Sequence, residues 1–129
     1  DPILTPEEVR VLRALLLEWG LVDDGTRIRR RYRFDGFSAA VEFLTKLAPI
    51  ANSQDHHPDI RLTMYRWLEA DYRTNSIGGL SLNDFIMAAR TDRLYGAYRP
   101  CSMKPRWLGR SLTTGKAPRA IASSVLVVI

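Results

Sequence analysis

The sequence has a single cysteine, Cys101, among its 129 residues. An intrachain disulfide framework is therefore excluded, and a reducing compartment is the simplest expectation. Long apolar stretches are also missing, because no uninterrupted run exceeds five residues, as in Val125 to Ile129. A run that short cannot span a bilayer, and the first residues lack the basic and then apolar layout of a signal peptide. We therefore expect a cytoplasmic protein that does not enter a membrane.

Net charge is absent from most of the chain. Residues 1–100 hold 14 Lys and Arg and all 14 Asp and Glu, so the excess of +5 comes from the basic residues after position 100. A basic tail favours an acidic partner, such as nucleic acid, anionic lipid or an acidic protein surface, and charge alone does not choose among these. A solvated tail that only aids solubility is the alternative.

The first part of the chain predicts a helix followed by a hairpin. Thr5 to Glu8 has the Thr, Pro and Glu spacing of a capping box, which opens a helix that we expect to end at Gly20. Asp23 to Thr26 is typical of a hairpin loop. It would join a strand at residues 21–22 to a second strand at residues 27–34.

A second helix is expected from Ser38, which can act as its N-cap. Pro49 predicts a kink or an early end, and the polar segment 52–58 is expected to be a loop. The apolar stripe of this helix would consist of Phe37, Ala40, Val41, Leu44, Leu47, Ala48 and Ala51.

Two more strands, at about residues 60–65 and 68–74, precede a third helix. Ser81 and Asp84 form a second capping box, and the helix should run through about Arg93. A four-stranded antiparallel sheet with three helices packed on one face satisfies the order α-β-β-α-β-β-α. We therefore predict an α+β domain over residues 1–98 and an irregular, basic extension containing Pro and Gly over residues 99–129.

Four arginines alternate along the expected second strand, at Arg27, Arg29, Arg31 and Arg33. The period of two places them on one face of the sheet. Such a row could bind an acidic protein surface, or it could be an ordinary solvated sheet face. Trp67 is similarly open to two interpretations, packing or an interface anchor, because Trp is enriched at binding hot spots.

The most unusual local feature is the segment Asp55 to Pro58, which contains the only two histidines, His56 and His57. Imidazoles exchange protons near neutral pH, and Pro58 stiffens the backbone beside them. A metal site would need further ligands at suitable spacing. A purely structural loop and an acid/base or ligand site are the other interpretations.

The residues around this segment resemble those of pterin-4a-carbinolamine dehydratases. The likeness consists of the His-His-Pro run, the aromatic Tyr65, the run Gly78-Gly79-Leu80-Ser81 and the segment that starts at Asp84. It covers roughly residues 4–94. It implies that family's fold, a homodimer or homotetramer, and removal of water from a 4a-hydroxy-tetrahydropterin.

The family's motif differs from this chain at two positions. A charged residue is expected where Asn52 stands, and a histidine is expected where Asn75 stands. Asn75 has no proton to transfer near neutral pH, and loss of one general acid or base costs about 10²–10⁴ in rate. The resemblance thus implies catalytic roles for His56, His57 and Asp84, with Asn75 replacing a histidine. It implies ligand contacts from Asn52, Asp55, Pro58 and Tyr65.

A branch of the family without the full catalytic set resembles a RuBisCO assembly factor of the α-carboxysome. The two replaced positions match that branch. The resemblance therefore implies a non-catalytic or weakly catalytic protein that assists RuBisCO assembly, with the RuBisCO large subunit as its partner and a location in the cytoplasm or at the carboxysome. In that case the arginine row and Trp67 would form the partner surface.

Two alternatives remain. One is an active dehydratase that uses His56 and His57. The other is a transcriptional cofactor, because the family includes one, but no DNA-reading element is recognisable and we do not expect nucleic acid as a partner. We expect neither a metal nor a cofactor.

Overall fold

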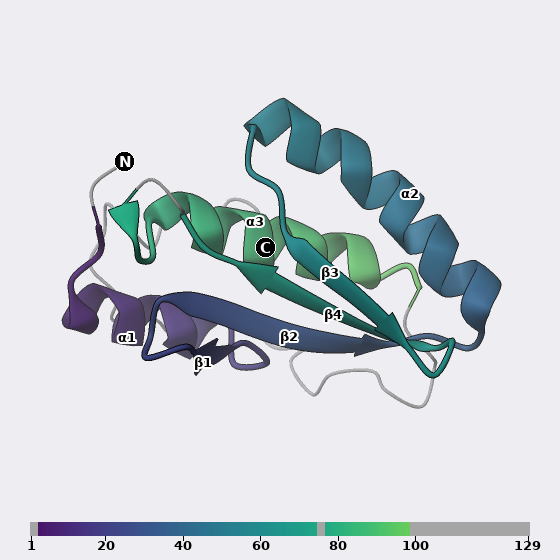
Figure 1. The fold of residues 1–129 in the computed structure, drawn as a ribbon, viewed down its shortest axis with the longest axis horizontal. Coiled ribbons are helices and arrows are strands. Elements are labelled where there is room, and N and C mark those ends of the chain that lie inside the picture. The colour runs from purple at the N-terminus through teal and green to yellow at the C-terminus, as the bar shows by residue number, and fades with distance from the viewer. Residues whose placement is uncertain (1–2, 75–76, 99–129) are drawn as a thin grey trace.

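The computed structural model describes residues 3–74 and 77–98 (Figure 1). In this part of the chain the strands form one antiparallel sheet in the order β1-β2-β4-β3. The predicted α+β fold and its element order are confirmed, while the expected extension over residues 99–129 lies outside the described residues. The elements are α1 (Pro6–Leu15), β1 (Gly20–Val22), β2 (Arg27–Arg33), α2 (Phe37–Gln54), β3 (Asp59–Thr63), β4 (Trp67–Tyr72) and α3 (Leu82–Tyr95).

The core lies where helices cover one face of the sheet. Figure 1 shows α2 and α3 on the same side of the sheet. Because successive side chains of a strand point to opposite faces, every second residue of β2 and β4 faces these helices. The strand residues buried there are Ile28, Tyr32, Leu68, Ala70 and Tyr72.

A polar contact inside this core ties α3 to the sheet. The carboxylate of Asp92 accepts hydrogen bonds from Trp19 Nε1 at 3.1 Å and from the Tyr32 hydroxyl at 2.5 Å. Arg30 donates to the same carboxylate at 2.7 Å, and its guanidinium lies 4.5 Å from the centre of the Tyr32 ring. The charge of Arg30 is therefore paired on the helix-covered side of the sheet, as a buried charge requires.

The first helix is shorter than predicted. The capping box at Thr5 and Glu8 is present, but α1 ends at Leu15, and Gly20 begins β1 instead of ending the helix. Two tight turns follow α1, in which the backbone N–H of Leu16 bonds to Arg13 and that of Trp19 bonds to Leu16. These turns place the indole of Trp19 in the core, where it is 1% exposed. The free energy gained by burying this ring therefore exceeds what a longer helix would contribute.

The second helix differs from the prediction in its ends and its rotation. Its N-cap is Gly36, not Ser38, and the helix continues through Pro49 to Gln54, so residues 52–54 are not loop. Phe37, Val41 and Ala48 from the predicted stripe are exposed. The buried stripe is Ala40, Phe43, Leu47 and Ala51. The apolar residues of this helix cover a wide arc, so their spacing alone leaves the rotation undetermined.

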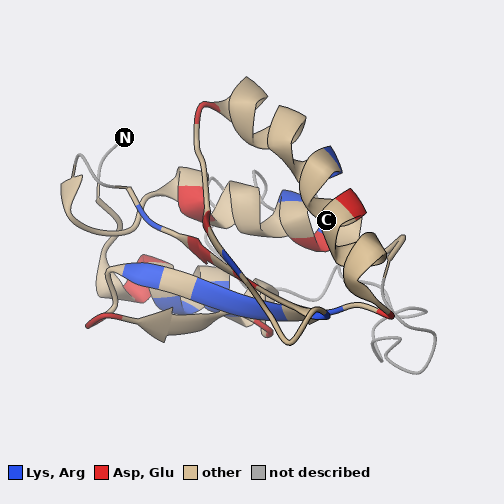
Figure 2. Ribbon diagram, turned by 45° about the vertical axis from the view of Figure 1, so that its right-hand side comes forward, with Lys and Arg blue, Asp and Glu red and all other residues tan. Residues whose placement is uncertain are grey.

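Figure 2 shows β2 as a largely basic strand. The predicted row of Arg27, Arg29, Arg31 and Arg33 lies on the outer face of the sheet, because Ile28 and Tyr32, which alternate with these arginines, are buried on the other face. Arg29 binds both oxygens of Asp71 on β4, with N–O distances of 2.7 and 2.8 Å. Arg27 reaches Asp71 Oδ2 at 3.0 Å. Burial alone would raise the pKa of the Asp71 carboxyl, but the hydrogen bonds from Arg29 and Arg27 outweigh burial and lower that pKa below its ordinary value.

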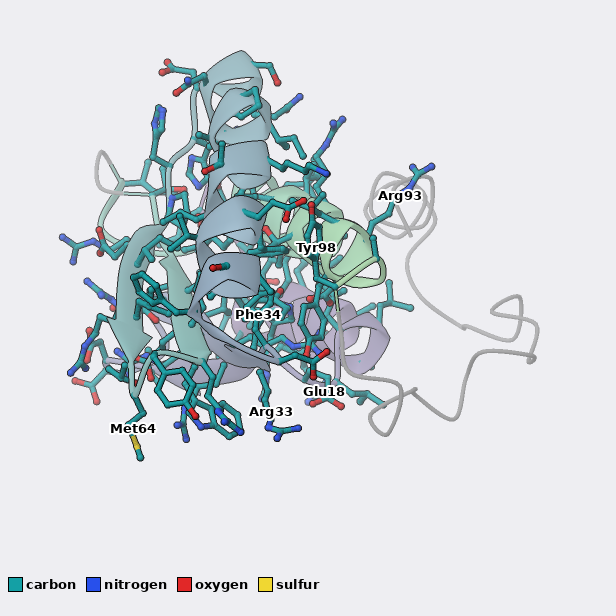
Figure 3. The ribbon with its side chains drawn as sticks, turned by 90° about the vertical axis from the view of Figure 1, so that its right-hand side faces the viewer. Glu18, Arg33, Phe34, Met64, Arg93 and Tyr98 are labelled. Carbon is teal, nitrogen blue, oxygen red and sulfur yellow. The ribbon has the colours of Figure 1, made fainter. Side chains whose placement is uncertain are left out.

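The other two arginines of the row have different surroundings. The exposed guanidinium of Arg31 lies 4.5 Å from the centre of the Trp67 ring, a cation–π contact between β2 and β4. Figure 3 shows Arg33 and Met64 pointing away from the body of the protein, whereas Phe34 lies under α2. The open part of this face is therefore centred on Arg31, Arg33 and Trp67.

Replacing Asp71 with Asn tests the paired arginines. A carboxyl with a lowered pKa stabilises the fold above its ordinary value of 3.8, and this contribution is lost as the pH falls through the folded-state pKa. We expect Asp71→Asn to lower the free energy of unfolding by roughly 1–2 kcal/mol at pH 7. The difference between variant and wild type should shrink below about pH 4, as measured by urea denaturation.

Asp59→Asn is the matched control, because the side chain of Asp59 is 71% exposed and lies 3.5 Å from Arg27. Its effect should stay within about 0.5 kcal/mol. Equal costs for the two variants at pH 7 would contradict the assignment of the stabilising pair to Asp71.

Candidate active site

The two histidines follow directly after α2. Asp55 ends the helix in a left-handed conformation, with φ of 50°, and the backbone N–H of His56 donates to Ala51 O at 3.1 Å. This turn points the two imidazoles to different surroundings. The His56 side chain is 12% exposed, whereas His57 and Asp55 are exposed.

The buried carboxylate of Asp84, in the first turn of α3, holds the His56 ring. Its Oδ1 lies 2.5 Å from His56 Nε2. Its Oδ2 accepts the backbone N–H of Ser81 at 2.9 Å and the hydroxyl of Thr74 at 3.0 Å. Because an ionised carboxylate only accepts hydrogen bonds, this contact requires a proton on Nε2 of His56. The Nδ1 atom is then the nitrogen through which His56 can accept a proton.

Tyr72 fixes the plane of the His56 ring. The two rings are nearly parallel, with an interplanar angle of 11° and centres 6.1 Å apart. The Tyr72 hydroxyl lies 2.8 Å from the hydroxyl of Thr91 on α3. Burial raises the pKa of Tyr72 above its usual range, so the ring stays neutral at physiological pH. His56 is therefore oriented by a carboxylate at its edge and an aromatic ring along its face.

His57 lies at the edge of a shallow hollow between α2 and β3. Its Nε2 atom is 2.9 Å from Asn52 Oδ1. The hollow has a volume of about 170 Å³ and is lined mainly by apolar side chains of α2, with Pro58 and Ile60 opposite them. Apolar walls with a few polar groups at the rim are typical of a small-molecule site.

The structure gathers some of the predicted site residues and separates others. His56 contacts Asp84, and His57, Asn52 and Pro58 line the same hollow. Tyr65 is in the β3–β4 turn, at the opposite end of β3 from the histidines (Figure 1). It is 54% exposed, and its hydroxyl bonds to Arg66. Asn75 lies outside the described residues.

Sequence reasoning missed Thr74 and Tyr72. Tyr72 could have been found from the alternation of β4, which places it on the same side as Leu68 and Ala70. Thr74 directly precedes Asn75, but a single threonine in a turn carries no pattern that points to a buried carboxylate.

Residues 3–74 and 77–98 contain neither a candidate metal site nor a candidate membrane-spanning helix. His, Cys, Asp and Glu side chains do not gather there in any group of three or more that could hold a metal ion. Within the same ranges, each helix is too short or too polar to cross a membrane.

Comparison with known proteins assigns the chain to a family. The family model described as pterin 4 alpha carbinolamine dehydratase matches residues 2–94. The chain belongs to this family. A relative from Aromatoleum aromaticum, provisionally named pterin-4-alpha-carbinolamine dehydratase, is 42% identical over 93 residues, which are 72% of this chain and 82% of the relative. A relative from Methylococcus capsulatus with the same provisional name is 38% identical over 93 residues, or 72% of this chain and 81% of the relative.

Solved structures of dehydratase-family proteins share the fold. A protein from Brucella melitensis described as a transcriptional coactivator/pterin dehydratase has a TM-score of 0.68 at 29% identity, covering 72% of this chain and 98% of that one. A pterin dehydratase-like protein described as a RuBisCO assembly factor in the alpha-carboxysome has a TM-score of 0.53 at 21% identity, covering 61% of this chain and 90% of that one. The second likeness concerns the fold alone.

The two histidines of this dehydratase-family protein should contribute unequally to stability. His56→Ala leaves Asp84 Oδ1 buried without its donor, so we expect the free energy of unfolding to fall by about 1–3 kcal/mol. His57→Ala changes an exposed residue and should stay within about 0.5 kcal/mol. Urea denaturation of both variants measures the difference, and equal costs would contradict the described division between a held and an exposed imidazole.

Proposed function

We propose that this chain binds a 4a-hydroxy-tetrahydropterin beside His56 and His57 and dehydrates it slowly. The observation that supports this function is the oriented pair of His56 and Asp84 next to a second imidazole at the edge of an apolar hollow. Relatives with dehydratase names at about 40% identity support the same class of chemistry.

The reaction needs two proton transfers. A proton leaves a ring nitrogen of the substrate, the bond between C4a and the hydroxyl breaks, and the hydroxyl takes up one proton and leaves as water. One neutral imidazole can accept the first proton, and one protonated imidazole can supply the second. His56 and His57 are sufficient in number for both roles, with His56 acting through Nδ1.

Asn75 and Asn52 explain why we expect the rate to be low. An amide at position 75 can hydrogen-bond the substrate but cannot move a proton near neutral pH. Asn52 contacts His57 through an amide oxygen, which is a weaker hydrogen-bond acceptor than a carboxylate oxygen. The site therefore has two imidazoles for the two proton transfers and lacks the third that the family motif expects, which is why we expect slow turnover.

Asn75→His is the direct test of this function. We expect the variant to turn over the carbinolamine about 10²–10⁴ times faster than wild type, because it regains a general acid or base. Stopped-flow absorbance with purified protein measures the rate, and Asn75→Gln serves as the control that changes the side chain without adding an imidazole. Wild-type turnover equal to that of Asn75→His would show that the site needs no third histidine.

Assistance in RuBisCO assembly, with the RuBisCO large subunit as partner, is the second candidate. The replaced positions Asn52 and Asn75 favour it, since an assembly factor needs a surface and no proton transfer. The open part of the outer sheet face, with Arg31 stacked on Trp67, is suited to an acidic protein surface. Arg27 and Arg29 contribute less to such a surface because Asp71 pairs with both.

Co-expression separates the second candidate from the first. If the outer face serves assembly, wild type should raise the yield of RuBisCO holoenzyme, and Trp67→Ala should remove most of that gain while leaving carbinolamine turnover unchanged. Glu7→Ala, on the exposed first turn of α1, controls for a general effect of substitution. An unchanged holoenzyme yield with wild type would eliminate the assembly role. The homodimer or homotetramer stays a prediction that sedimentation equilibrium can measure.

A further inference from the structure

Thr74 is held between the end of β4 and the start of α3. Its backbone N–H donates to Gly79 O at 3.1 Å, which forms an isolated bridge across the turn before α3. Its hydroxyl donates to Asp84 Oδ2 at 3.0 Å and lies 2.8 Å from the hydroxyl of Ser81. The side chain is thus fixed by its backbone on one side and by the site on the other.

The hydroxyl of Thr74 determines how the Asp84 carboxylate is turned. Rotation about the terminal bond of an aspartate is only weakly restricted by its own torsional preference, so the donors around it set the orientation. Among the described residues, the donors to Oδ2 are Ser81 N–H and the Thr74 hydroxyl, and Oδ1 faces His56. Without the hydroxyl, Oδ2 loses one of these donors and the plane of the carboxylate is less constrained.

We propose that Thr74 is a positioning residue that locks the Asp84 carboxylate against His56 and so keeps the His56 proton on Nε2. This leaves Nδ1 unprotonated and ready to accept the proton from the substrate. The tautomer is a property of the free protein. Only the kinetic consequence rests on the proposed dehydratase function.

The first arm of the test reads the tautomer without substrate. The variant Thr74→Val keeps the β-branched shape and removes the hydroxyl, and Thr74→Ser keeps the hydroxyl. We expect the ¹⁵N chemical shifts of the His56 ring in wild type and Thr74→Ser to report a proton on Nε2, and those in Thr74→Val to move toward a mixture of tautomers. Should Thr74→Val fail to fold, Thr74→Ala gives the same comparison.

The second arm reads the reaction. Thr74→Val should lower kcat by roughly tenfold, as expected for one hydrogen bond to a charged group, with a smaller change in KM. Thr74→Ser should recover most of the rate. The control is Thr45→Val, which removes the hydroxyl of an exposed threonine on α2 that donates to Val41 O of its own helix. It should change neither arm.

The two arms separate this inference from the proposed function. Wild-type protein without dehydratase activity would overturn the proposed function, while the ¹⁵N shifts would still decide the role of Thr74. Unchanged His56 shifts in folded Thr74→Val would overturn the positioning role, whatever the kinetics. The same result follows if Thr74→Ser loses the wild-type shifts as completely as Thr74→Val.

Discussion

The buried carboxylate of Asp84 is the contact on which the rest of the site depends. It joins the loop after α2, through His56, to the end of β4, through Thr74, and to the start of α3, through Ser81. A carboxylate in such a place is tolerated only because donors surround it. The orientation of the His56 imidazole therefore depends on the position of α3, which carries Asp84.

Family membership and activity rest on different residues of this protein. Membership follows from a match that extends over residues 2–94, and most of these residues build the helices and the sheet. Activity depends on a few proton carriers, and fold alone does not supply them. The outer face of the sheet also differs from what the sequence suggests. Two of the four arginines in its row, Arg27 and Arg29, are paired with Asp71 and are less available to a partner.

Local signals in the sequence predicted much of the fold. The capping boxes at Thr5 and Ser81 and the alternation in β2 and β4 follow from neighbouring residues, and the structure contains them. The end of α1, the rotation of α2 and the hydroxyl of Thr74 beside Asp84 depend on long-range packing, so spacing along the chain could not predict them. Tyr65 shows the same limit, because a match in motif position did not bring its ring to the histidines.

The left-handed turn at Asp55 gives two neighbouring histidines different surroundings and different structural roles. His56 is bound to the buried carboxylate of Asp84, so its loss would weaken the packing of α3. His57 lies at the surface, where it contacts the exposed amide of Asn52. A substitution of His57 should therefore cost little stability, whereas a substitution of His56 removes a donor from the buried carboxylate of Asp84. A protein of this fold that no longer catalyses the reaction would therefore still need His56 for its stability.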